Sequence, residues 1–226
     1  NLRIGLNRWS GDLMQSVPTA DGFYEVELIE NEARLSGEMT VRVDDVISAS
    51  GDLFIELRDE HTVQLSDGTT IVDDQILVGG SDASGAILPD SPVNAGFADF
   101  DVLVAVSTEN GAATDDRRRW VSASAHVGSA TVAGYALAGI QDASLALNQA
   151  LTSTAGTVAA ADAAVLDWSG TPLSLPVEVD SDANVVLGYD SRTLAVTANA
   201  ELNFGPALLA GEFGVARDYE NNRWVV

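Results

Sequence analysis

The sequence predicts an all-β, antiparallel fold, built as a sandwich or roll-like, elongated repeat unit of 226 residues. Many short segments alternate apolar and polar residues, which is typical of strands with one buried face. Turn signals such as Asp67-Gly68 and Asn110-Gly111 separate these segments about every 8–12 residues. The two ends of the chain also match each other after a shift of 200 positions, which indicates a repeat. A β-solenoid is the alternative fold, although it would need a shorter and stricter period.

Clear strand patterns fill the first half of the chain. The segment from Phe23 to Glu30 follows an Asp21-Gly22 turn and places Tyr24 and Val26 on one side of a half-buried strand. Gly79–Ala95 contains glycines and prolines and is predicted to be irregular. Further strands are predicted at Val41–Val43, Leu53–Leu57, Thr62–Leu65, Gln75–Val78 and Phe100–Val106.

The second half begins with a predicted strand from Trp120 to Val127. Asp142–Ala150 has helical propensity, but its leucines alternate with polar and small residues, so a strand is predicted. Helix is expected only as short turns between about Gly139 and Ala164. Pro176 cannot donate to a β-ladder, so the strand around it should be an edge or bulged strand. The period is completed by strands at Val185–Gly188, Thr193–Ala198 and Ala200–Phe204.

The match between the two ends is ungapped. Its members are Leu2 with Leu202, Ile4 with Phe204, Gly5 with Gly205, Gly11 with Gly211, Asp12 with Glu212, Leu13 with Phe213, Tyr24 with Trp224, and Val26 with Val226. We therefore interpret residues 1–226 as a single β-rich unit: one period of about 200 residues (about 1–200) and the start of the next (201–226). The two matching segments should adopt the same strand–turn–strand path, with Gly11 and Gly211 at equivalent bends. They should also lie at opposite ends of an elongated body.

A shorter phrase recurs inside the period. Leu35–Val43 and Ala49–Leu57 each contain a small residue, a glycine, an acid and then alternating apolar residues. Glycine followed by an acid suits a turn or a β-bulge, and the alternation that follows predicts a strand with one face buried.

Composition excludes several functions. A net charge of −23 disfavours nucleic acid as a partner, because phosphate binding requires a cationic surface. No apolar run approaches the length that inserts into a bilayer, and an export signal is expected outside this segment. The absence of cysteine excludes disulfides and thiolate chemistry. All eleven basic residues are arginine, so lysine Schiff bases and lysine isopeptide bonds are excluded too.

The candidate metal ligands are Asp180, Asp182 and Asn184, whose oxygens alternate as in the opening of a calcium loop. The EF-hand pattern then fails, because Val185 replaces its glycine and Ser191 stands in place of its glutamate. No cofactor is expected other than Ca²⁺ at a looser acidic turn. A solvated turn is the alternative.

Two further groups are candidates for chemistry. His61 and His126 are the only histidines, and His126 lies on a serine-rich strand face, where an exposed histidine is expected rather than a triad with Ser122 or Ser124. The only basic cluster is Arg117–Arg119 beside Trp120, and it should pair locally with Asp115 and Asp116. The alternative is that these arginines bind a carboxylate or a sugar acid.

The glycine–acid phrases at Gly11, Gly37, Gly51 and Gly211, with the run Leu53–Leu57, resemble the tandem β-rich repeats of very large bacterial surface or secreted proteins. That family includes adhesin-like and filament-forming chains. The resemblance implies a non-catalytic structural module at the cell surface or outside the cell, part of a stalk or fibre, whose partners are neighbouring copies arranged head to tail. The alternative is an adhesin-type module that binds a glycan or a surface protein, with or without Ca²⁺. A β-sandwich enzyme acting on polysaccharide ranks last.

Overall fold

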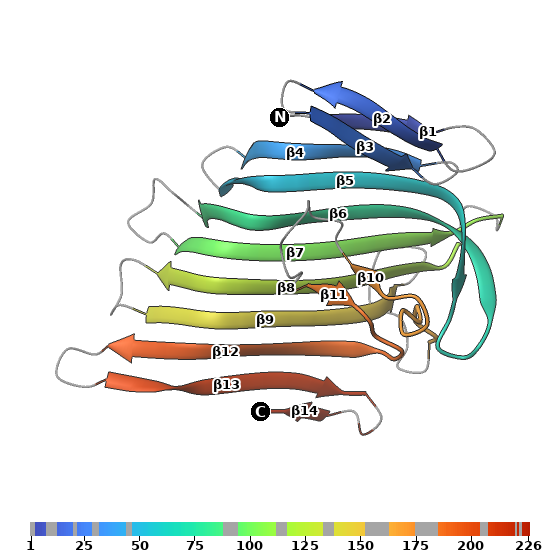
Figure 1. Cartoon of the computed structure of the whole chain (residues 1–226). Coiled ribbons are helices and arrows are strands. Elements are labelled where there is room, and N and C mark those ends of the chain that lie inside the picture. The colour runs from blue at the N-terminus through green and yellow to red at the C-terminus, as the bar shows by residue number, and fades with distance from the viewer. Residues whose placement is uncertain are drawn as a thin grey trace.

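The chain is an all-β protein built around one open antiparallel sheet (Figure 1). A computed structural model describes residues 3–7, 13–19, 22–28, 32–43, 47–87, 95–111, 117–132, 138–151, 163–174, 185–203, 208–219, 221 and 223–226. These residues contain fourteen strands and no helix, so the all-β antiparallel prediction is confirmed. The strands are β1 (Arg3–Asn7), β2 (Leu13–Thr19), β3 (Gly22–Leu28), β4 (Glu32–Val43), β5 (Ile47–Gln64), β6 (Thr70–Ile87), β7 (Ala95–Glu109), β8 (Arg119–Val132), β9 (Ala138–Leu151), β10 (Leu173–Ser174), β11 (Val186–Leu187), β12 (Thr193–Asn203), β13 (Leu208–Asp218) and β14 (Arg223–Val225).

The main sheet has ten strands in the order β1-β4-β5-β6-β7-β8-β9-β12-β13-β14. Strands β4 to β9 follow one another as successive hairpins, and the chain returns to the sheet at β12 after an excursion. Strands β1 and β14 therefore form its two edges. Two small sheets, β2–β3 and β10–β11, lie outside this order. The described residues accordingly contain no helix that is long and apolar enough to cross a membrane.

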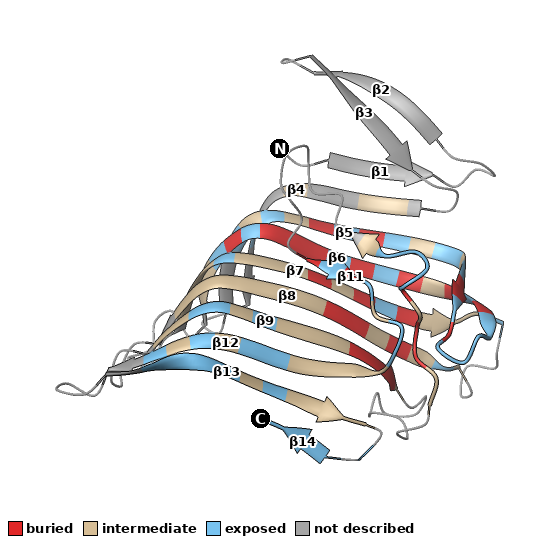
Figure 2. Cartoon of the chain, turned by 60° about the horizontal axis from the view of Figure 1, so that its bottom comes forward, coloured by how far each residue is buried: buried red, intermediate tan, exposed pale blue. Residues whose placement is uncertain are grey.

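Successive side chains along each central strand point to opposite faces of the sheet. We call the face that carries Phe54, Leu103 and Trp120 the inner face, and the opposite face the outer face. The inner face is covered by residues 163–174 and 185–191, which we call the strap (Figure 2). Val165, Leu166, Trp168, Val185 and Leu187 of the strap join the inner-face residues in the hydrophobic core.

Four acidic residues mark irregular points in the sheet. They are the only described non-glycine residues with positive φ: Glu60 (57°), Asp82 (49°), Asp99 (53°) and Asp142 (48°). Each lies at a shift in strand register, where one strand contains an extra residue. Such bulges bend a sheet, and aspartate tolerates the left-handed conformation better than most residues. The sheet is accordingly curved (Figure 2).

The prediction of an irregular segment at Gly79–Ala95 is wrong for residues 79–87, which continue β6. Both neighbouring strands pair with this part of β6, and that ladder outweighs the weak strand propensity of glycine. Gly80 allows close packing there, because a Cβ atom would lie 2.5 Å from Leu53 Cδ2 and the leucine side chain would have to move. Residues 88–94 lie outside the described residues. The predicted strand at Asp142–Ala150 is confirmed within β9.

The glycine–acid phrases have mixed outcomes. Gly51 lies at a register shift between β5 and β6, as predicted for a bulge, and an added Cβ would lie 2.7 Å from the Cα of Ala83. The predicted bend at Gly211 is wrong, because this residue lies inside β13 opposite Ala200. Continuous pairing with β12 keeps the backbone extended there. Gly11 lies outside the described residues.

Candidate functional site

The sequence-predicted metal ligands, Asp180, Asp182 and Asn184, all lie outside the described residues. Within the described part of the chain, no group of three or more acidic or histidine side chains could hold a metal ion. The calcium site therefore stays a prediction from the sequence.

Ser122 and His126 do not form a nucleophile–base pair. Ser122 is fully buried under the strap, where its Oγ donates to Asn148 Oδ1 (2.8 Å) and accepts from Trp168 Nε1 (2.9 Å). His126 lies further along β8, between Asp101 and Ser144 on the adjacent strands. Ser122 therefore acts as a hydrogen-bonding anchor in the protein interior.

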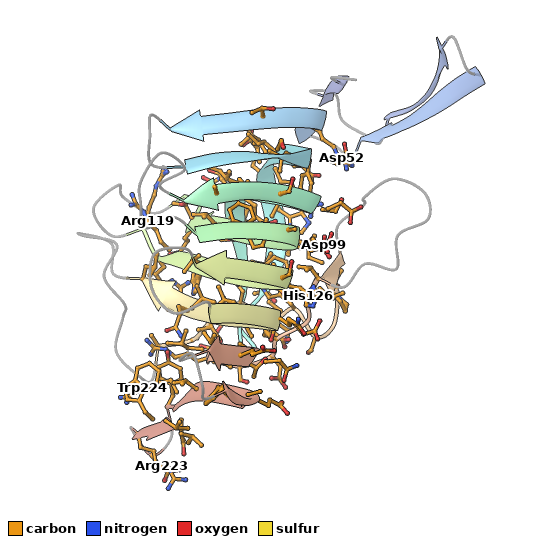
Figure 3. The ribbon with its side chains drawn as sticks, turned by 90° about the vertical axis from the view of Figure 1, so that its left-hand side faces the viewer. Asp52, Asp99, Arg119, His126, Arg223 and Trp224 are labelled. Carbon is orange, nitrogen blue, oxygen red and sulfur yellow. The ribbon has the colours of Figure 1, made fainter. Side chains whose placement is uncertain are left out.

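The basic cluster before β8 forms a local ion pair. Arg118 donates from Nε to Glu109 Oε2 (2.9 Å) and from Nη2 to Glu109 Oε1 (2.7 Å). These hydrogen bonds lower the pKa of Glu109 and raise that of Arg118. The partners expected from sequence, Asp115 and Asp116, lie outside the described residues. In Figure 3, Arg119 and His126 lie well apart, so they do not share a site.

A buried polar network attaches the strap to the inner face. Asn148 Nδ2 donates to the carbonyl oxygens of Leu166 (2.8 Å) and Ser191 (3.1 Å). Trp120 Nε1 donates to the carbonyl oxygen of Ala164 (2.9 Å). Each of these three contacts joins a sheet side chain to strap backbone, which satisfies polar groups that burial would otherwise leave unpaired. Sequence reasoning missed this network because the strap is distant in the chain.

A cavity of about 330 Å³ opens beside the strap and is lined by Arg58, His61, Asp167, Trp168 and Leu173 among others. Arg58 forms an ion pair with the buried Glu56. Burial lowers the pKa of His61, and the nearby positive charge of Arg58 lowers it further. The lowered pKa favours the neutral form of His61, which lies beside an arginine that is already paired with Glu56.

The outer face carries three apolar rows whose large side chains are mostly partly exposed, and Arg192 and Tyr219 cover Gln149 at one end of the face. Side chains directly opposite each other on neighbouring strands lie on the same face, and three such rows cross the sheet without a charged residue. Ile76 is 47% exposed and Val78 is 42% exposed. The rows contain Ile55, Leu57, Ile76, Val78, Val102, Val104, Val106, Val121, Ala123, Ala125, Leu145, Leu147, Leu194, Val196 and Val215.

The hairpins β2–β3 and β13–β14 have the same register, 200 residues apart. In β13–β14 the pairs are Ala216 with Val225, Arg217 with Trp224, and Asp218 with Arg223. In β2–β3 the corresponding pairs are Ser16 with Glu25, Val17 with Tyr24, and Pro18 with Phe23. The two hairpins belong to opposite ends of the molecule, one near the β1 edge and the other at the β14 edge (Figure 1).

The C-terminal hairpin is also fixed by side chains. Gln149 donates to the carbonyl oxygen of Thr193 (2.9 Å) and to the hydroxyl of Tyr219. Arg192 donates to Gln149 Oε1 (2.8 Å) and stacks over the Tyr219 ring at 4.5 Å. These contacts connect β9, the start of β12 and the end of β13 in one cluster.

No family model, curated protein or solved structure matches the chain.

Proposed function

We propose that this chain is a structural repeat module of an extracellular surface protein, stalk or fibre, without catalytic activity. Neighbouring copies follow one another head to tail and together extend a single antiparallel sheet. The observation that carries this proposal is the shared register of β2–β3 and β13–β14 at a separation of 200 residues.

Register is a demanding property of a hairpin. A slip of one residue moves every side chain to the opposite face, so register is fixed by the side-chain pattern and the turn. Two segments with related sequences and the same register therefore behave as two copies of one structural unit. Their location at opposite ends of the molecule is what a propagating array requires.

The edges of the sheet support the same function. Strand β14 has only three residues and borders no further described strand, and β1 borders only β4. Exposed edges invite pairing with another chain or another repeat. The high negative charge favours solubility and disfavours indiscriminate pairing between separate chains.

A two-unit protein tests the tandem function. It consists of residues 1–200 twice in succession, followed by residues 201–226. One period contributes nine strands to the sheet, β4 to β9 and β12 to β14, so small-angle scattering should show a maximum dimension longer by roughly 40 Å. Circular dichroism per residue should be unchanged. A maximum dimension equal to that of the single unit, or two units that tumble independently, would contradict the proposal.

The outer face supports a second candidate function, the lateral binding of a second copy through the same face. A compact monomer of 23.6 kDa exposes about 9,800 Å², whereas this chain exposes 13468 Å². Part of this surface belongs to the outer face, where Ile55, Leu57, Ile76 and Val78 are each more than 40% exposed. Two apolar sheet faces pack well at a separation of about 10 Å. The aliphatic rows offer no hydrogen bonds to a glycan, so they favour a protein surface of the same chemistry.

Substitutions with threonine test lateral binding, because threonine keeps the shape and strand propensity of valine but adds a hydroxyl group. The double substitution Val78→Thr with Val106→Thr should weaken self-association in analytical ultracentrifugation by about tenfold or more. Val186→Thr on the strap is the matched control, since Val186 is 41% exposed. A wild-type chain that remains monomeric at high concentration, or an equal effect of the control, would contradict this function.

A further inference from the structure

We infer that the β2–β3 hairpin is a docking element, which pairs with the β12 edge of a preceding copy of this chain. At that edge the hairpin occupies the position that β13–β14 has in the structure described above. The inference rests on the proposed tandem function and adds to it the contact that joins one unit to the next.

The acceptor edge is seen in its occupied state. Strand β12 pairs with β13 through nine successive residue pairs, from Ala195 with Ala216 to Asn203 with Leu208. On its other side β12 is bonded to β9, so its position is fixed by the main sheet. Removal of β13 and β14 would leave without partners the backbone groups of β12 that face β13. These groups would bind any strand that fits their register.

The N-terminal segment resembles β13 in sequence where β13 pairs with β12, and β2 contains residues 13–16 of that stretch. After a shift of 200 positions, residues 8–16 correspond to the part of β13 that pairs with β12. Glycine, acid and a large apolar residue recur at positions 11–13 and 211–213, in the segment that crosses the middle of β12. Gln15 departs from the pattern, because Val215 is apolar.

The hairpin also lacks a place in the main sheet of its own unit. It forms a separate two-stranded sheet, while β4 pairs with β1 through five residue pairs. An isolated two-stranded hairpin is marginally stable in water and needs further strands or a packed face. A preceding copy supplies that support through β12. The free edge of the docked hairpin pairs with β4 of its own unit only after β1, which holds that edge in the single chain, is displaced.

A chimera of unchanged length tests this contact. It carries residues 1–200 followed by residues 1–26, so that the N-terminal segment fills positions 201–226. Because the chain has no cysteine, introduced cysteines report the register cleanly. In the natural chain, Asn199→Cys with Glu212→Cys should form a disulfide, since these residues are directly paired. In the chimera, Asn199→Cys should form one with Asp12→Cys of the added segment.

The off-register control moves the second cysteine by one position, to Phe213→Cys in the natural chain and to Leu13→Cys of the added segment in the chimera. This pair should cross-link about tenfold less in both proteins. A slipped chimera, in which residues 2–27 fill positions 201–226, is the second control, and it should melt well below the in-register chimera. The docking mode is overturned if the in-register chimera has the same melting temperature as the slipped one, or if it cross-links equally in both registers. The tandem function fails separately, because the two units can still form one extended sheet through another edge strand, such as β1 against β12, when the hairpin does not dock.

Discussion

The two faces of the same central strands differ in what covers them. On the inner face, polar residues such as Ser122, Gln75 and Asn148 are buried beneath the strap. On the outer face, apolar residues such as Ile76 and Val78 are almost half exposed. Burial in this molecule is therefore decided by where the strap lies, and not by the hydropathy of each face. Among the described residues the more polar face is covered and the aliphatic face is partly exposed, and exposed apolar patches are typical of interaction sites.

The largest difference between the faces should appear in adjacent residues of β7. Leu103 is fully buried on the inner face, and its neighbour Val104 lies on the outer face. Leu103→Ala should lower the free energy of unfolding by about 3 kcal/mol, because it leaves a cavity beneath the strap. Val104→Ala should cost less than about 1 kcal/mol. Urea unfolding of the two variants measures both, and equal losses would mean that the outer face is also packed in the free chain.

A smaller difference is expected for polar residues of β9. Asn148→Ala should lower the free energy of unfolding by about 2 kcal/mol, because the carbonyl oxygens of Leu166 and Ser191 lose their donor in a buried site. Ser144→Ala is the matched control: Ser144 is exposed and bonds Thr197 across the sheet, so its loss should cost about 0.5 kcal/mol or less. Proteolysis within the strap should also accelerate in Asn148→Ala alone. Unchanged proteolysis would show that other contacts hold the strap.

The smallest effect concerns Asp73, a buried carboxyl on the inner side of β6. Burial raises the pKa of this group. The folded chain therefore binds this proton more tightly than the unfolded chain. The resulting stabilisation is complete below the ordinary carboxyl pKa of about 4, and it is lost as the pH rises through the raised value.

Asp73→Asn removes this titration and keeps the shape of the side chain beside Gln75, whose Nε2 lies 3.1 Å from Asp73 Oδ2. Compared with the wild type, the variant should gain stability between acidic and neutral pH, which urea unfolding at a series of pH values measures. A constant difference between the two proteins at every pH would show that Asp73 does not titrate in this range.

The sequence was sufficient to predict most of the strands, residues 79–87 of β6 excepted, but not the choice of buried face. Alternation in β8 separates Val121 and Ala123 from Trp120 and Ser122, yet alternation alone does not say which set is covered. The strap decides it through Trp168, whose contact with Ser122 spans 46 residues of sequence. Such a long-range contact leaves no local pattern to detect.

The match between the two ends was a better guide than the site motifs, because the described pairs of β2–β3 and β13–β14 share one register. The predicted common path fails at its start: Arg3–Asn7 pairs with β4, whereas Asn203, the counterpart of Arg3, pairs with Leu208 across the β12–β13 hairpin. Glycine was the less reliable signal. At Gly80 it permits close packing inside a strand, and at Gly211 it lies in a continuous ladder, so neither residue marks a turn.

The equivalence of the two hairpins is tested most directly by disulfide formation in the natural chain. Ser16→Cys with Glu25→Cys probes β2–β3, and Ala216→Cys with Val225→Cys probes β13–β14. Both in-register pairs should close under mild oxidation. The slipped pairs, in which the second cysteine replaces Tyr24 or Trp224, should stay reduced. A hairpin that closes only its slipped pair would have a different register from its counterpart, and the two ends of the chain would then not be copies of one unit.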